Sequence, residues 1–145
     1  MTRHLTSGLD RSACLGLLGT RSWGRLVYTR RALPEVLPAS YHLEGERVLI
    51  RLAHSEAATA SRDAVVAFEV DDFDAAFRSG WTVTIVGLAR EVTPSGEREW
   101  LAGQDIPPWA GVSEDHVLAM TAGRMSGHRL TPDEPSPAGS RAALT

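Results

Sequence analysis

The sequence contains no lysine and no asparagine, and all 15 of its basic residues are arginine. Without lysine the chain cannot form a Schiff base with pyridoxal phosphate and cannot build a lysine-bearing P-loop. Cys14 is the single cysteine, which excludes an intrachain disulfide, a CxxC redox pair and a thiolate zinc site. Its leucine neighbours favour a buried apolar role for this thiol.

The size and charge of the chain predict one weakly acidic domain. Its 145 residues match the usual domain size, and 18 acidic against 15 basic residues leave a net charge of −3. Such a chain lacks the basic surface that nucleic acid and anionic membranes attract, so neither is expected as a partner. No apolar run approaches the length of a membrane span or a signal-peptide core, which predicts a cytoplasmic protein. Residues 1–130 are expected to form the domain, and 131–145, with three prolines, a disordered C-terminal tail.

Alternating polar and apolar residues predict a mainly β fold. An N-terminal helix is expected to begin at Ser7 or Asp10 and to end at Gly19. The expected strands are 25–29, 35–43, 47–52, 64–70, 81–90 and 116–121, the last resumed at 124–130. Between them we expect a helix over 54–62, a polar excursion over 71–80, a helical turn over 97–102 and a proline-rich loop over 104–111. About six strands with a few short helices are typical of a β-barrel.

Three residues mark special positions in these strands. Pro34 and Pro38 fall in or beside the second strand, and proline cannot donate to a ladder, so this strand is predicted to be an edge or to carry a break. Gly87 within a long strand predicts a bulge or a close backbone approach. The expected core comprises Leu26, Val36, Leu49, Val66, Phe68, Val83 and Ile85.

The common catalytic and metal-binding signatures are missing. The sequence contains no GxGxxG, HExxH, GxSxG or EF-hand pattern, and its five histidines lack ligand spacing, so no metal site is expected. The acidic group Glu69, Asp71, Asp72 and Asp74 alternates with apolar residues and is interpreted as the solvated face of a strand rather than a cation site.

Arg51 is a candidate anion-binding residue. It ends an apolar strand and precedes a predicted helix that contributes Ser55 and Thr59, so guanidinium, amide and hydroxyl donors would converge on one anion. The alternative is a solvated arginine paired with Glu56. Trp81 is interpreted as a core residue rather than a cofactor contact.

Several segments share an order and spacing that identify a family. These are 24–27, 33–41, 47–51, 65–71, 80–83 with Gly87 and Ala89, Pro108-Trp109, Asp115-His116 and 127–130. Together they resemble the pyridoxamine 5′-phosphate oxidase-like flavoproteins, in their small actinobacterial branch near the nitroimidazole-resistance proteins. The resemblance covers residues 10–130.

The resemblance implies a six-stranded split β-barrel that forms a homodimer, with FMN bound in two equivalent clefts between subunits. It implies that the backbone of Leu37, Pro38, Ala39 and Ser40 lies along the flavin ring. It implies a phosphate site at Arg51, Leu52, Ser55 and Thr59, and a contribution from Trp81 and Thr82 that reaches the cofactor from the partner subunit.

The function implied is an FMN-dependent oxidoreductase acting on a small molecule that the sequence does not identify. The family's phosphate corner usually reads Arg-Thr-Ala-Pro-Gly-Ser-Lys, whereas this chain has Leu52 and Ala57 in place of the threonine and the lysine, and Glu56 adds a negative charge. These differences predict weaker phosphate binding. No residue is identified as catalytic, and Tyr41 and His42 are the nearest candidates for proton delivery. The alternatives are a protein that binds deazaflavin F420, a haem-binding relative, and a cofactor-less dimeric binding protein.

Overall fold

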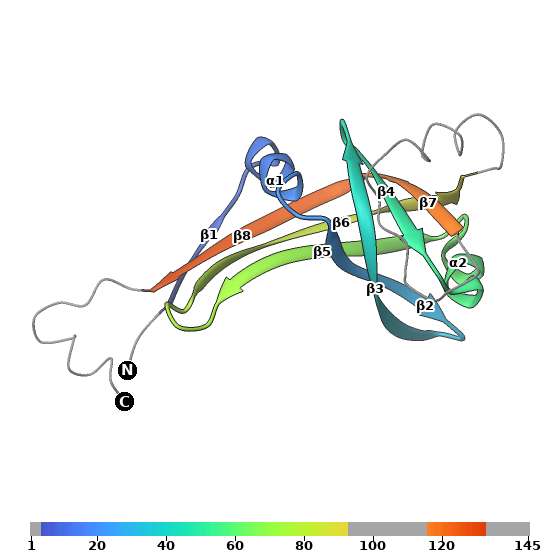
Figure 1. Cartoon of the computed structure of the whole chain (residues 1–145), viewed down its shortest axis with the longest axis horizontal. Coiled ribbons are helices and arrows are strands. Elements are labelled where there is room, and N and C mark those ends of the chain that lie inside the picture. The colour runs from blue at the N-terminus through green and yellow to red at the C-terminus, as the bar shows by residue number, and fades with distance from the viewer. Residues whose placement is uncertain (1–3, 93–115, 133–145) are drawn as a thin grey trace, which may run out of the picture.

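Figure 1 shows the fold of the protein, a computed structural model that describes residues 4–92 and 116–132. The strands are β1 (His4–Gly8), β2 (Trp23–Arg30), β3 (Leu33–Glu44), β4 (Arg47–Leu52), β5 (Val65–Asp74), β6 (Ser79–Glu91), β7 (His116–Thr121) and β8 (Arg124–Pro132). The helices are α1 (Arg11–Leu18) and α2 (Ser55–Ser61).

Six of these strands form a closed ring in the order β6, β5, β2, β3, β4, β7, with β7 pairing back to β6. The ring closes because β6 divides one of its edges between two partners. Its residues 80–86 pair with β8, and its residues 89–91 pair with β7. Strands β8 and β1 extend the sheet away from the ring (Figure 1). The predicted six-stranded split barrel is confirmed, and β1 is a strand that the sequence pattern missed.

Helix α1 packs on the part of the sheet formed by β6 and β8. Asp10 is its N-cap, since the Asp10 carboxylate accepts a hydrogen bond of 2.8 Å from the Ala13 amide. Cys14 is buried, and a Cβ placed on Gly127 of β8 would lie 2.7 Å from its Sγ. Burial raises the pKa of the Cys14 thiol, which agrees with the predicted apolar role. At the other end of the helix, Tyr41 donates a hydrogen bond of 2.5 Å to the Leu18 carbonyl oxygen.

The first half of β3 is an edge. Among the described strands, residues 33–39 pair with β2 alone, whereas pairing with β4 begins at Ser40. Pro34 and Pro38 both lie in this one-sided part, where the ladder tolerates a missing N–H. The prediction made from these two prolines is therefore confirmed.

The core agrees with the sequence at all but one position. Leu26, Val66, Phe68, Val83 and Ile85 are buried in the main cluster, and Leu49 is buried in a smaller one with Val92, Val117 and Ala119. The prediction for Val36 is wrong, because its residue surface is 60% exposed. Val36 pairs with Val27, and this pair lies on the face opposite Leu26 and its partner Leu37.

The predicted polar excursion begins too early. Residues 71–74 belong to β5, and only 75–78 form the turn to β6. The acidic side chains are compatible with a strand because arginines neutralise them: Arg25 of β2 pairs with Asp71, and Arg21 pairs with Asp72. Charge alternation along a strand thus indicated the solvated face correctly but not the end of the strand.

Several expected elements lie outside the described residues. These are the turn at 97–102, the loop at 104–111 and the motif residues Pro108, Trp109 and Asp115. Strand β8 continues to Pro132, two residues past the expected domain boundary, and 133–145 lie outside the described residues. Neither α1 nor α2, the helices of the part of the chain described, is long and apolar enough to cross a membrane.

We predict that Gly87→Ala lowers the free energy of unfolding by about 1–3 kcal/mol, the range for overpacking. A Cβ at Gly87 would lie 2.3 Å from the Thr121 carbonyl oxygen, so the β7–β8 connection crosses β6 at this residue. This is the close backbone approach that the sequence predicted.

The matched control is Gly16→Ala in α1, where no atom lies within 4 Å of the added Cβ. This change should raise the free energy of unfolding by roughly 0.5–1 kcal/mol, because alanine is the better helix former. Urea unfolding measures both variants. Equal midpoints for Gly87→Ala and wild type would contradict the close approach.

A second prediction concerns Glu69 on the outer face of β5. Burial, together with the Asp71 carboxyl beside it, raises the pKa of Glu69 from its ordinary value of 4.5. The folded chain therefore holds the Glu69 proton more tightly than the unfolded chain, and the stability this contributes is lost as the pH rises through the raised pKa. Glu69→Gln removes this titration. Its free energy of unfolding should increase relative to wild type from about pH 4 to pH 7 in urea titrations, and a difference that stays constant or falls would contradict the shift.

Candidate functional site

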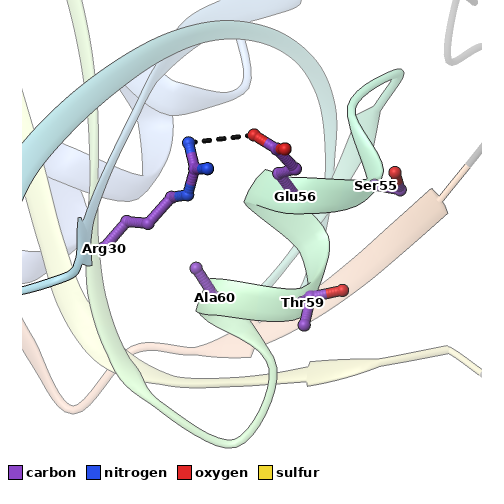
Figure 2. Close-up of a pocket in the computed structure, with 5 residues that line it drawn as sticks. All are labelled: Arg30, Ser55, Glu56, Thr59 and Ala60. Carbon is purple, nitrogen blue, oxygen red and sulfur yellow. Dashed lines mark ion pairs between the residues drawn. The ribbon is translucent and has the colours of Figure 1, made fainter.

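A pocket of about 410 Å³ lies between the turn end of the β2–β3 hairpin and the corner where β4 leads into α2. It is lined by Tyr28, Arg30, Glu35, Leu37, Ala53, His54, Ser55, Glu56 and Ala57. A second hollow of about 280 Å³ adjoins it along α2 and is lined by Arg30, Ser55, Glu56, Thr59 and Ala60 (Figure 2). We call the two together the hairpin pocket, because they share three lining residues.

Arg30 is the central charged residue of the hairpin pocket. Its Nη1 lies 2.9 Å from Oε2 of Glu56 on α2 and 3.9 Å from Oε2 of Glu35 on β3. Figure 2 shows the Arg30 and Glu56 side chains pointing toward each other across the pocket. One guanidinium thus stands between two carboxylates.

Sequence reasoning missed Arg30, Tyr28 and Glu35. The signal that could have found them is the period of two along the hairpin. Tyr28 and Arg30 follow the core residue Leu26 at steps of two, so they share its face, and Glu35 is the register partner of Tyr28. The inward face continues past the core and becomes the wall of the pocket.

The turn after Arg30 fixes where β2 ends. Arg31 and Ala32 both have positive φ, at 54° and 65°, and link β2 to β3 through two residues. Two left-handed residues in a two-residue connection match the twist of the strands that they join. The backbone beneath the Arg30 side chain is therefore held by a tight hairpin.

Tyr28 supplies a protonated hydroxyl to the pocket. Burial, and secondarily the Glu35 carboxylate, raise the pKa of the Tyr28 phenol above its ordinary value. The group therefore stays neutral at physiological pH and can donate a hydrogen bond.

The predicted ring-binding segment reaches the pocket only in part. Leu37 lines it, and on the edge of β3 away from β2 no described strand pairs with residues 33–39. Pro38 is exposed, whereas Ala39 and Ser40 are buried.

The predicted phosphate residues divide into two groups. Ser55 and Thr59 line the hairpin pocket. Leu52 is fully buried in the core, and Arg51, whose Cα pairs with Ser40, is not among the lining residues. Glu56 has a different partner from the arginine considered on sequence grounds, because it pairs with Arg30.

Trp81 and Thr82 lie away from the hairpin pocket of their own chain. Trp81 is buried and is the register partner of Asp72, and Thr82 donates a hydrogen bond of 2.7 Å to Glu69 Oε2. Tyr41 is engaged with α1, and neither Tyr41 nor His42 lines the pocket. In the described residues no group of three or more histidine, cysteine or acidic side chains is placed to hold a metal ion.

Comparison with known proteins agrees with the fold. The family model described as pyridoxamine 5′-phosphate oxidase matches residues 10–136. An uncharacterised protein of Mycobacterium tuberculosis is 36% identical over 137 residues, covering 89% of this chain and 88% of that protein.

Two solved structures share the fold. The FAD binding protein from Mycobacterium smegmatis is 25% identical with a TM-score of 0.72, covering 88% of this chain and 98% of that one. A candidate 5-nitroimidazole antibiotic resistance protein from Bacteroides thetaiotaomicron is 12% identical with a TM-score of 0.69, covering 92% and 95%. On the matched residues and the shared split barrel, the chain belongs to the pyridoxamine 5′-phosphate oxidase-like family.

Proposed function

We propose that this protein binds FMN in the hairpin pocket and acts as a flavin-dependent oxidoreductase on a small molecule. The observation that carries the proposal is the placement around one pocket of Arg30 and of a β3 edge that no other described strand covers. Family membership adds support, since the M. smegmatis relative is described as an FAD binding protein.

The residues present fit a flavin. A volume of about 410 Å³ lies within the ~300–1,000 Å³ range of small-molecule sites. The free edge of β3 offers backbone donors and acceptors to the polar edge of a flavin ring, while Leu37 and Ala53 supply apolar contact. Ser55 and Thr59 place hydroxyls at the α2 end, near Arg30.

FMN is favoured over FAD by the count of positive charges. Among the described residues that line the hairpin pocket, Arg30 is the one arginine, and two carboxylates stand beside it. One guanidinium matches one phosphate group, whereas a pyrophosphate with an adenosine would meet no second arginine there.

A bound flavin would supply the hydride or electron transfer, and the chain would supply binding, orientation and exclusion of water. Tyr28 holds its proton and can donate a hydrogen bond into the pocket. The protein is proposed to act without an obligatory acid or base from its own side chains.

A second copy of the chain is the proposed partner. An apolar row crosses four strands on the face opposite the core, from Val36 of β3 through Val27 and Ala67 to Val86 of β6. Val36 is well exposed at the end of this row, next to the strand edge that borders the pocket. A homodimer that covers the row would shield both apolar surface and pocket edge from water.

We predict that the purified protein binds FMN and that Ser55→Glu weakens this binding about tenfold or more. Ser55 is exposed at the start of α2 and lines both hollows, so a carboxylate there adds a like charge facing the phosphate. Fluorescence titration with FMN measures the affinity.

The matched control is Ser12→Glu, an exposed serine in the first turn of α1, which should leave FMN affinity unchanged. Riboflavin, which lacks the phosphate, should bind wild type and Ser55→Glu alike. If the protein binds FAD, F420 or haem but does not bind FMN in the same set of titrations, FMN is rejected as the cofactor.

For the homodimer we predict a sedimentation mass near twice the 15.7 kDa of the chain. Val36→Asp should shift the protein toward the monomer because it places a charge in the apolar row. Ala13→Asp on the exposed side of α1 is the control and should remain dimeric. A monomeric wild type at micromolar concentration would contradict the proposal.

A further inference from the structure

We propose that Arg30 is the residue that binds the flavin phosphate, and that Glu56 occupies Arg30 until the phosphate displaces it. The inference deepens the proposed function and rests on it. It assigns the anion site to the end of β2 rather than to the end of β4.

Among the described residues lining the hairpin pocket, Arg30 is the one arginine and lines both hollows. Its guanidinium points toward Glu56 in the first turn of α2 (Figure 2). Ser55 and Thr59 line the same side of the pocket and add hydroxyl donors. Arg51, the residue expected from the sequence, is not among these lining residues.

Glu56 is suited to act as a displaceable internal ligand. Its side chain is 70% exposed, so the carboxylate can turn into water without leaving a buried charge behind. An ion pair this open to solvent is weak, because water and salt screen it. A phosphate monoester carries nearly two negative charges near pH 7 and accepts two parallel hydrogen bonds from a guanidinium, so it competes with the single charge of the Glu56 carboxylate.

Arg30 itself is held in place by the β2–β3 hairpin, on the side away from Glu56. Its side chain is 32% exposed and begins at the tight Arg31-Ala32 turn. Glu35 Oε2 lies 3.9 Å from Nη1, is excluded from water and accepts no hydrogen bond from the described residues. When Glu56 departs, the electrostatic attraction of Glu35 still keeps the guanidinium over the pocket, so the exchange requires little rearrangement of Arg30.

A double-mutant cycle on FMN affinity tests the exchange. Arg30→Gln should lower the affinity about tenfold to a hundredfold, the loss expected for a charged hydrogen bond. Glu56→Gln should raise the affinity severalfold, because Arg30 no longer has to break an ion pair. In the Arg30→Gln background most of the gain from Glu56→Gln should disappear.

Arg62→Gln, which removes the ion pair between Arg62 and Glu91 at the far end of α2, is the control and should leave the affinity unchanged.

Each outcome separates the inference from the proposed function. If wild type and Arg30→Gln bind FMN equally, Arg30 is not the phosphate ligand and the inference fails while flavin binding stands. If Glu56→Gln helps equally with and without Arg30, Glu56 acts by repulsion alone and the exchange is wrong. If wild type fails to bind FMN but Glu56→Gln binds it, the exchange is supported when adding Arg30→Gln abolishes that binding, and it is wrong when the binding survives. If no variant binds any flavin, the proposed function falls and the inference with it. Circular dichroism and thermal unfolding of each variant confirm that it is folded.

Discussion

The division of one β6 edge between two partners is the constraint on which the rest of the structure depends. Because β6 pairs with β8 over its first half and with β7 over its last three paired residues, the ring closes while two strands remain outside it. Gly87 stands at the change of partner, where the β7–β8 connection comes within contact of its backbone. A side chain at this position would press against the β7–β8 connection, so the change of partner favours glycine here.

Much of this fold follows from patterns in the sequence. The period of two predicted most strands, Asp10 and Gly19 predicted the ends of α1, and Pro34 and Pro38 predicted the free edge of β3. The errors have physical causes. Residues 71–74 resemble a loop because three of them are acidic, but Arg25 and Arg21 pair with Asp71 and Asp72 and make their place in a strand possible. Val36 resembles a core residue because it is apolar. Its exposure depends on which face of the β2–β3 hairpin turns inward, and the register of the hairpin decides that face.

The site was harder to predict than the fold, because it depends on contacts between distant segments. Ser55 and Thr59 were predicted from their position after β4, and both line the pocket. Arg30 was missed because its partners Glu35 and Glu56 lie on different elements, and only folding brings all three together. The family resemblance directed attention to Arg51, but the hairpin pocket is bordered by the arginine at the end of β2.

The pairing of β1 with β8 joins the two ends of the described chain, with His4 opposite Pro132. This contact has the longest sequence separation in the sheet, so the loop that it closes costs the most entropy and it forms late. During synthesis from the N-terminus, β6 is complete before β7 and β8 exist, and its edge stays without partners until they emerge. An unpaired strand edge attracts other chains. The same division of β6 that shapes the barrel therefore makes the nascent protein vulnerable to misassembly until its last strands are made.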